Sequence, residues 1–168
     1  TPPTAVRPLR AGKGWCYEGG IRVPLLVRVP GMEEGVVSEE PVISHDFYPT
    51  LVNALELNLK QDVDFDGVDI SPALRQKSLQ RETLFWHYPH YHGSTWTPGA
   101  AIRQRDWKLV VYYEDDRSEL YNLADDLGEQ NDLSAEFPAK KVELEKLLLA
   151  KQRAMGARLP ERNPGFGN

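Results

Sequence analysis

Apolar and polar positions follow different patterns along the first part of the chain. Residues 1–20 are rich in Pro, Gly and Arg and show no apolar periodicity, which predicts an extended loop. Residues 21–29, IRVPLLVRV, form a continuous apolar run that is bounded by glycines and by a Pro-Gly pair, and such a run predicts a buried strand. Pro24 lies inside this run, so a regular central ladder is disfavoured at that point.

A helix is predicted next, from about Asp46. In VISHDFYPTLVNALEL the apolar residues recur at helical spacing, and either Asp46 or Ser44 can cap the helix start. Pro49 fits such a helix only in its first turn. A strand followed by a helix is typical of an α/β layer, which we expect to continue before Thr1. Residues 60–80 are polar and contain turn residues, so an organisational break is expected there.

After the break, short β-branched and aromatic runs predict antiparallel strands over residues 82–88, 99–114 and 118–123, with Asp106 at a turn inside the long run. Residues 138–159 predict an amphipathic helix laid on this sheet, because an apolar stripe faces Lys and Glu; its members are Val142, Leu144, Leu147, Leu148 and Met155. The expected fold is therefore an α/β fragment over residues 1–75, followed by an α+β C-terminal subdomain over residues 76–168 with an antiparallel sheet and a packed helix.

Composition excludes several classes of function. The chain has 20 Lys and Arg against 25 Asp and Glu, a net charge of -5, so no global positive field attracts nucleic acid or an anionic membrane surface. No apolar run reaches the roughly 18 residues that a membrane-spanning helix needs. The start lacks both Met and a signal-peptide pattern, which favours a piece of a longer protein. The single cysteine, Cys16, excludes an internal disulfide.

Lys13 is the first candidate functional residue. It lies between two glycines, where a tight backbone can present its point charge to an oxyanion, although a solvated loop lysine gives the same pattern. The following YEGG favours a turn in which Glu18 caps neighbouring amides. Arg22 then pairs with Glu18 or stays exposed at a strand edge.

The segment HYPHYHG, residues 87–93, interleaves tyrosines with three histidines, His87, His90 and His92. Imidazole both donates and accepts hydrogen bonds near neutral pH. No Cys or acidic ligand lies nearby at a suitable spacing for a metal. The pattern favours a sugar or aryl substrate, with a structural loop of partly buried histidines as the alternative.

Several ordered blocks carry a resemblance to a known family: PLRAGKGWCYEGGIRVPLLVRVPG, SHDFYPTLVNAL, DGVDISPAL, LFWHYPHY, AIRQRDWKLV and ELYNLADDLGEQNDL. Together they resemble the C-terminal part of the formylglycine-dependent (type I) sulfatases, close to the arylsulfatase A type. The resemblance runs nearly end to end. It implies an alkaline-phosphatase-like α/β domain followed by a smaller subdomain with a four-stranded antiparallel sheet and a helix.

The resemblance also implies roles for particular residues. Lys13 matches the family's sulfate-contacting lysine and is thus the expected catalytic residue of this chain. His87, His90, His92 and Arg103 become candidates for substrate binding, because the C-terminal subdomain often walls the substrate cleft. The family's formylglycine nucleophile and calcium ligands belong to blocks that are not in this chain, so both cofactors are expected only in the full-length enzyme.

Two residues could be mistaken for the nucleophile. The family modifies a residue in the pattern Cys or Ser, any residue, Pro or Ala, any residue, Arg. Ser71 in SPALR fits this loose pattern but follows the lysine block, and we interpret the match as chance. Cys16 is followed by YEGG and does not fit.

The leading hypothesis is the C-terminal portion of a sulfate-ester hydrolase that is inactive alone. A phosphate or phosphonate monoester hydrolase of the same superfamily and a noncatalytic carbohydrate- or partner-binding module remain as alternatives. Expected partners are a sulfated small molecule or carbohydrate, the rest of the sulfatase domain, and another copy through exposed edges. The resemblance implies export to the periplasm, the outside or the lysosome, while substrate identity and oligomeric state stay open.

Overall fold

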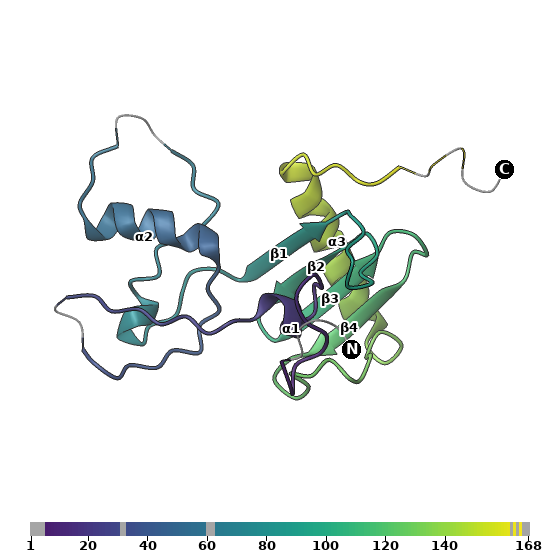
Figure 1. The fold of residues 1–168 in the computed structure, drawn as a ribbon, viewed down its shortest axis with the longest axis horizontal. Coiled ribbons are helices and arrows are strands. Elements are labelled where there is room, and N and C mark those ends of the chain that lie inside the picture. The colour runs from purple at the N-terminus through teal and green to yellow at the C-terminus, as the bar shows by residue number, and fades with distance from the viewer. Residues whose placement is uncertain (1–5, 31–32, 60–62, 162, 164, 166–168) are drawn as a thin grey trace. The chain divides into compact units, whose positions relative to one another are not determined.

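Four antiparallel strands form one sheet in the second half of the chain. The computed structural model describes residues 6–30, 33–59, 63–161, 163 and 165. The strands are β1 (Thr83–Tyr88), β2 (Gly99–Gln104), β3 (Trp107–Tyr112) and β4 (Ser118–Asn122), and they lie in the order β1-β2-β3-β4 (Figure 1). Gln104 pairs with Trp107, so a tight turn at Arg105 and Asp106 joins β2 to β3. The predicted antiparallel strands and the turn at Asp106 are confirmed.

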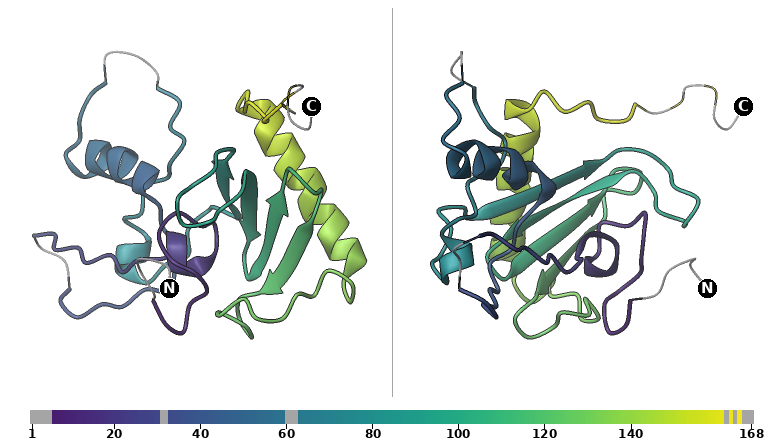
Figure 2. Two further views of the ribbon diagram at one scale, coloured as in Figure 1. Left: turned by 45° about the vertical axis from the view of Figure 1, so that its right-hand side comes forward. Right: turned by 60° about the vertical axis from the view of Figure 1, so that its left-hand side comes forward.

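The two faces of this sheet are covered by different segments, because alternate residues of a strand point to opposite faces. Ala100, Ile102 and Leu109 pack with Leu144 and Leu148 of helix α3 (Pro138–Ala154). On the other face, Ala101, Val110, Tyr112 and Tyr121 pack with Cys16 and Tyr17, which immediately precede the one-turn helix α1 (Glu18–Ile21). Figure 2 shows α3 on one side of the strands and α1 on the other.

Helix α3 confirms the predicted amphipathic helix but corrects part of its apolar stripe. Leu144, Leu148 and Gln152 are buried at spacings of four residues, whereas Val142 and Met155 are 45% and 59% exposed. Gln152 takes the inward position after Leu148 because its side-chain amide donates a hydrogen bond to the Tyr113 hydroxyl at 2.6 Å. The polar residue is satisfied there, so the stripe does not need to continue to Met155.

The predicted strand over residues 21–29 is wrong for this chain. Ile21 ends α1, and the following residues belong to no strand, with Val23 and Leu26 78% and 95% exposed. A strand needs a neighbour to accept and donate its ladder bonds, and none of the strands described above pairs with this run. Pro24 also removes one backbone donor.

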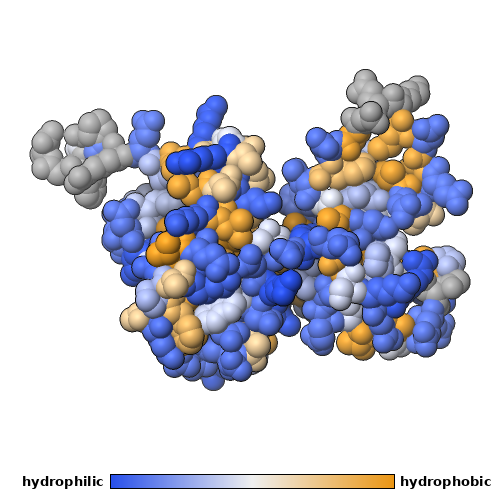
Figure 3. Space-filling view, turned by 180° about the vertical axis from the view of Figure 1, so that it is seen from behind, coloured by the Kyte–Doolittle hydropathy of each residue, from blue (hydrophilic) through white to orange (hydrophobic). Residues whose placement is uncertain are grey.

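Two compact units make up the described chain. One contains the described parts of Thr1–Pro24 and Glu82–Asn168, and the other contains those of Leu25–Arg81. The second unit holds the short 3-10 helices η1 (Ser44–Asp46) and η2 (Ala73–Arg75) and the helix α2 (Phe47–Ala54). The predicted helix near Asp46 is confirmed, and Pro49 is buried in its first turn. Apolar side chains lie on the molecular surface (Figure 3), and in this unit they include Leu26, Val37, Leu51, Leu55 and Leu57.

Asp46 is the polar centre of the second unit. Its buried carboxylate accepts hydrogen bonds from the backbone amides of Ile43 (2.8 Å) and Val68 (3.0 Å) and pairs with Arg81 at 2.5 Å. Burial alone would raise the pKa of this carboxyl, but Arg81 and the two amides hold that pKa below its usual value. Asp46 therefore ties together three segments that are distant in sequence.

The variant Asp46→Asn is expected to show a pH-dependent loss of stability. Because the pKa of Asp46 is lower in the folded chain, its carboxylate stabilises the fold above the unfolded pKa of about 3.9, and this contribution is lost as the pH falls through the lowered value. The free energies of unfolding of the wild type and the variant should differ at about pH 7 and converge below about pH 3. Asp64→Asn, at an exposed position, is the control. A difference that is equally large at both pH values would contradict the assignment.

Candidate functional site

Lys13 lies at the exposed tip of a tight loop between Arg10 and Gly20. The amide of Gly19 donates to the carbonyl oxygen of Arg10 at 3.0 Å. A Cβ atom added at Gly19 would come within 2.3 Å of the Arg10 carbonyl oxygen, and one at Gly20 would come within 2.1 Å of the Trp15 carbonyl oxygen. Only glycine allows this close approach, so the EGG sequence closes the loop behind Lys13.

Gly14 joins this loop to the histidine loop, which is the connection of β1 to β2 over residues 89–98. Its φ of +89° lies in the left-handed region, and an added Cβ would come within 2.1 Å of His92 Nδ1 and 2.7 Å of Ser94 Oγ. The indole N–H of Trp15 donates to the carbonyl oxygen of Ser94 at 3.0 Å. The structure thus brings the residue next to Lys13 into contact with His92.

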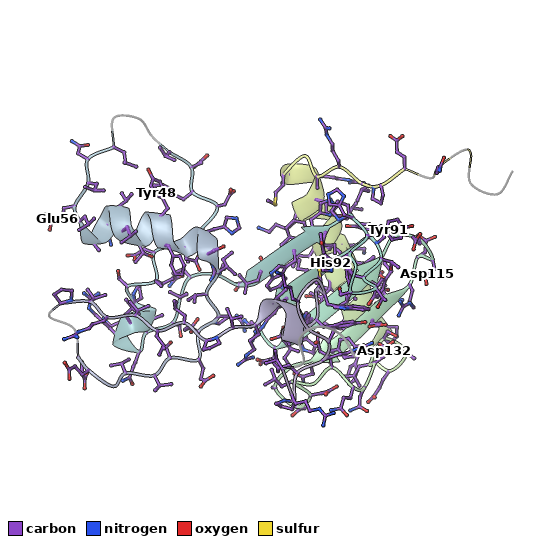
Figure 4. All side chains as sticks on the ribbon, in the orientation of Figure 1. Tyr48, Glu56, Tyr91, His92, Asp115 and Asp132 are labelled. Carbon is purple, nitrogen blue, oxygen red and sulfur yellow. The ribbon has the colours of Figure 1, made fainter. Side chains whose placement is uncertain are left out.

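An aromatic cluster supports this part of the histidine loop. The ring of Tyr88 stacks on that of Trp96 at 6.3 Å, and the rings of His90 and His92 each lie 6.2 Å from Tyr88. His90 is exposed and His92 is half-buried, with its Nδ1 2.8 Å from Ser94 Oγ. His92 and Tyr91 belong to the same loop (Figure 4). Lys13, His90 and His92 therefore form the candidate site.

His87 and Arg103 lie elsewhere in the same unit. His87 faces α3, where its Nδ1 is 2.8 Å from the Tyr113 hydroxyl and its Nε2 is 2.9 Å from the carbonyl oxygen of Arg158. Arg103 lies near the end of β2 that is far from the histidine loop, and its Nε–H donates to the Arg105 carbonyl oxygen at 2.7 Å. The structure does not bring these two residues together with His92, and their assignment to substrate binding stays a prediction.

A buried ion cluster lies beneath the loop and was missed from the sequence. The ammonium of Lys108 is fully buried and lies 2.8 Å from Oε1 of Glu18 and 2.8 Å from Oε1 of Glu129. The contact between Lys108 and Glu129 is an ion pair, but Glu129 Oε1 accepts no hydrogen bond from the described residues. The sequence does indicate that Lys108 is buried, because it alternates with Val110 and Tyr112 on the inward face of the strand.

Burial raises the pKa of the Glu129 carboxyl more than the ammonium of Lys108 and the amide of Glu18 lower it. That amide donates to Glu129 Oε2 at 2.6 Å. Glu18 is therefore held through both its side chain and its backbone, and the expectation that it caps neighbouring amides is wrong. Of the two alternatives for Arg22, the structure shows pairing with Glu18, at 3.6 Å.

A second polar network fixes the start of the same segment. The buried carboxylate of Glu119 accepts hydrogen bonds from the hydroxyls of Tyr17 and Tyr121 and pairs with Arg10 and Arg117. The guanidinium of Arg10 also donates to the Glu129 carbonyl oxygen at 2.9 Å and lies 3.9 Å from the centre of the Tyr17 ring. Residues on both sides of Lys13 are thus anchored to β3, β4 and the loop that follows.

The chain matches a known protein family over most of its length. Residues 11–154 match the family described as N-sulphoglucosamine sulphohydrolase, C-terminal. The chain belongs to this sulfatase family. The resemblance to sulfatases seen in the sequence blocks is confirmed, and the four-stranded sheet with its packed helix is the sulfatase C-terminal subdomain.

Relatives of this sulfatase chain are sulfatases too. It is 40% identical over 151 residues to a sulfatase of Formosa agariphila, covering 83% of this chain and 27% of the relative. It is 43% identical over 84 residues to human arylsulfatase A, covering 49% of this chain and 16% of that protein. The chain spans about a quarter of the length of the Formosa sulfatase.

A solved structure adds a substrate complex. The chain is similar to BT4656, whose structure was determined in complex with its substrate D-glucosamine-2-N,6-O-disulfate, with a TM-score of 0.54 and 28% identity. The similarity covers 64% of this chain and 23% of BT4656. The shared part is therefore again a minor fraction of the matched protein.

Neither a cluster of metal ligands nor an ionised thiol is present among the described residues of this sulfatase chain. Among residues 6–30, 33–59, 63–161, 163 and 165, no group of three or more His, Cys, Asp or Glu side chains could hold a metal ion. The calcium ion that the family implies does not fit these residues. Burial raises the pKa of Cys16 to about 12, so its thiol stays neutral. None of the helices described is long and apolar enough to cross a membrane.

Substitution of Gly14 by alanine is expected to lower the free energy of unfolding by about 1–3 kcal/mol, because the new methyl group clashes with His92 at a positive φ. Gly93→Ala is the matched control in the same region, since a Cβ there meets no atom within 4 Å. Its effect should stay within about 0.5 kcal/mol. Chemical denaturation of both variants provides the test, and equal effects would contradict the contact between the two loops.

Proposed function

We propose that this chain is the C-terminal part of a sulfate-ester hydrolase and that Lys13 contacts the sulfate group of the substrate. The observation that carries the proposal is the packing of Gly14 against His92, which sets the exposed Lys13 beside the histidine loop. A cation and hydrogen-bonding imidazoles then border one region of the same unit. Such a combination suits an anionic group attached to a polar or aromatic body.

Lys13 supplies electrostatic stabilisation in this proposal. As the sulfuryl group is transferred, negative charge changes on its oxygens and on the leaving oxygen. A fixed ammonium beside these oxygens lowers the energy of the transition state more than that of the bound ester. The anchored backbone on both sides of Lys13 keeps this charge in place without reorganisation.

The histidine loop would recognise the substrate body. His90 is exposed next to Tyr88, so its ring can donate hydrogen bonds to sugar hydroxyls or accept hydrogen bonds from them. The disulfated glucosamine substrate of BT4656 supports a sulfated sugar as the substrate class. His87 and Arg103 are kept as more remote contributors, because His87 faces α3 and Arg103 lies near the end of β2 that is far from the histidine loop.

The whole enzyme is expected to supply the formylglycine nucleophile and the calcium site from its other residues. The boundary between the α/β domain and the C-terminal subdomain is proposed near residues 75 and 76. Exposed apolar residues of the Leu25–Arg81 unit would pack against the rest of that α/β domain. Export, and inactivity of the present chain alone, belong to the same proposal.

The proposal is tested by assaying the complete protein on matched nitrophenyl esters of sulfate, phosphate and phosphonate. The expected result is preferred hydrolysis of the sulfate ester, with no steady turnover by the present chain alone. Preference for phosphate or phosphonate would instead assign the protein to the monoester hydrolases. Sugar binding without hydrolysis of any ester would make it a binding module.

Replacement of His90 by alanine in the complete enzyme is expected to change the ratio of kcat/KM between a sulfated sugar and an aryl sulfate by about tenfold. The reaction on the aryl sulfate should change little, because the imidazole contacts the substrate body rather than the reacting group. His45→Ala, at another exposed histidine, is the control. An unchanged ratio would show that the loop is structural.

A further inference from the structure

We propose that Lys108 is a positioning residue that holds Lys13 in place through Glu18. This inference rests on the proposed role of Lys13 at the sulfate group. Lys108 does not reach the substrate, because its ammonium is fully buried beneath the loop. Its effect on the reaction must pass through the residues it contacts.

The path from Lys108 to Lys13 is short and continuous. Lys108 pairs with the side chain of Glu18 at 2.8 Å, and Glu129 accepts a hydrogen bond from the Glu18 backbone amide at 2.6 Å. Gly19 and Gly20 follow directly and pack on the carbonyl groups of the loop, including those of Arg10, Gly12 and Trp15. The end of the loop that carries Lys13 is therefore fixed to β3 by the ion cluster.

The desolvation cost of burying these charges indicates that the ion cluster does more than fill space in the core. Charges buried in a sheet face carry a large desolvation cost, and well-packed apolar residues of similar volume often serve stability as well or better. An ion cluster differs from an apolar contact because it is directional and fixes the register of the groups it joins. Glu18 is held at both its carboxylate and its amide. These two contacts together allow the loop only one position against the sheet.

The neighbouring network at Glu119 does not replace this role. It anchors Arg10 and Tyr17 through hydrogen bonds to β4, and so it holds the start of the segment and the residue before α1. The ion cluster ties Glu18 to β3 and to the loop after β4, whereas its other ion pair, with Arg22, stays within the same short segment. Loss of Lys108 should thus release the Glu18 side chain and loosen the EGG closure, while the backbone contacts of Glu18 with Glu129 and of Gly19 with Arg10 keep the segment on the sheet.

The test is a double-mutant cycle in the complete enzyme, with Lys108→Met and Lys13→Ala, read as kcat/KM for an aryl sulfate well below the unfolding temperature. Lys108→Met alone is expected to lower kcat/KM by about tenfold to a hundredfold. In the Lys13→Ala background the same change should have less than about a twofold effect, because the residue it positions is absent. Should Lys108→Met not fold, Glu18→Gln takes its place in the same cycle.

The control is Arg81→Met, which breaks another buried ion pair in the Leu25–Arg81 unit. It should lower stability as Lys108→Met does and leave kcat/KM unchanged. Equal losses of kcat/KM from Lys108→Met in both backgrounds, or none in either, would overturn the inference. An unchanged kcat/KM in Lys13→Ala alone would instead refute the proposed function on which the inference rests.

Discussion

Replacement of Lys13 by alanine in the complete enzyme is expected to lower kcat for a sulfate ester by about 10²–10³-fold, the loss typical of one preorganised group facing a developing oxyanion. Its side chain is exposed at the loop tip, so removing it leaves no cavity in the core. The melting temperature should therefore stay close to that of the wild type. Steady-state kinetics and thermal unfolding of the same preparation separate the two effects.

Two further variants sharpen this result. Lys13→Arg keeps the charge but changes its shape and hydrogen-bonding geometry, and should recover only part of the activity. Lys146→Ala removes an exposed lysine from α3 and should leave kcat unchanged. A Lys13→Ala enzyme within about threefold of the wild type would show that the lysine is an ordinary surface residue.

Replacement of Lys108 by methionine is expected to lower the free energy of unfolding by about 3–5 kcal/mol at neutral pH, the range for removing one partner of a buried ion pair. The change leaves Glu18 and Glu129 side by side, with the Glu18 amide still bonded to Glu129. The burial that already raises the pKa of Glu129 then acts without the opposing ammonium.

This loss should depend on pH in a defined direction. A carboxyl whose pKa is raised in the folded state favours folding below its unfolded pKa, and the benefit is lost as the pH rises through the raised value. The deficit of Lys108→Met should therefore shrink as the pH falls towards about 4. Adding Glu129→Gln should restore part of the stability at neutral pH. A deficit below about 1 kcal/mol would contradict the burial of a functioning ion cluster.

Local sequence patterns predicted the elements that depend on local chemistry. Alternating β-branched and aromatic residues predicted the antiparallel strands, and the turn at Asp106 follows from the same pattern. Spacing also predicted α3, but not that Gln152 points inward, because this depends on Tyr113, which follows β3 and lies on the α3 face. The strand over residues 21–29 was wrong since strand formation requires a partner that local apolarity does not reveal.

The site was only partly predictable for the same reason. Residue type and glycine spacing indicated Lys13, whereas its loop reaches the histidine loop through contacts such as Gly14 with Ser94, which are 80 residues apart. His87 and His92 looked equivalent in sequence, but the strand directs His87 to the α3 face. The alternation of Lys108 with Val110 and Tyr112 indicates that it is buried, but nothing near it in sequence shows that Glu18 and Glu129 meet it.

The most direct measurement is a crystal structure of the complete enzyme with a sulfate ester or inorganic sulfate in its active site. We expect the Lys13 ammonium within about 2.7–3.2 Å of a sulfate oxygen, and His90 or His92 beside the substrate body. A bound sulfate group whose oxygens are all contacted by other residues, with Lys13 directed to solvent, would contradict this expectation.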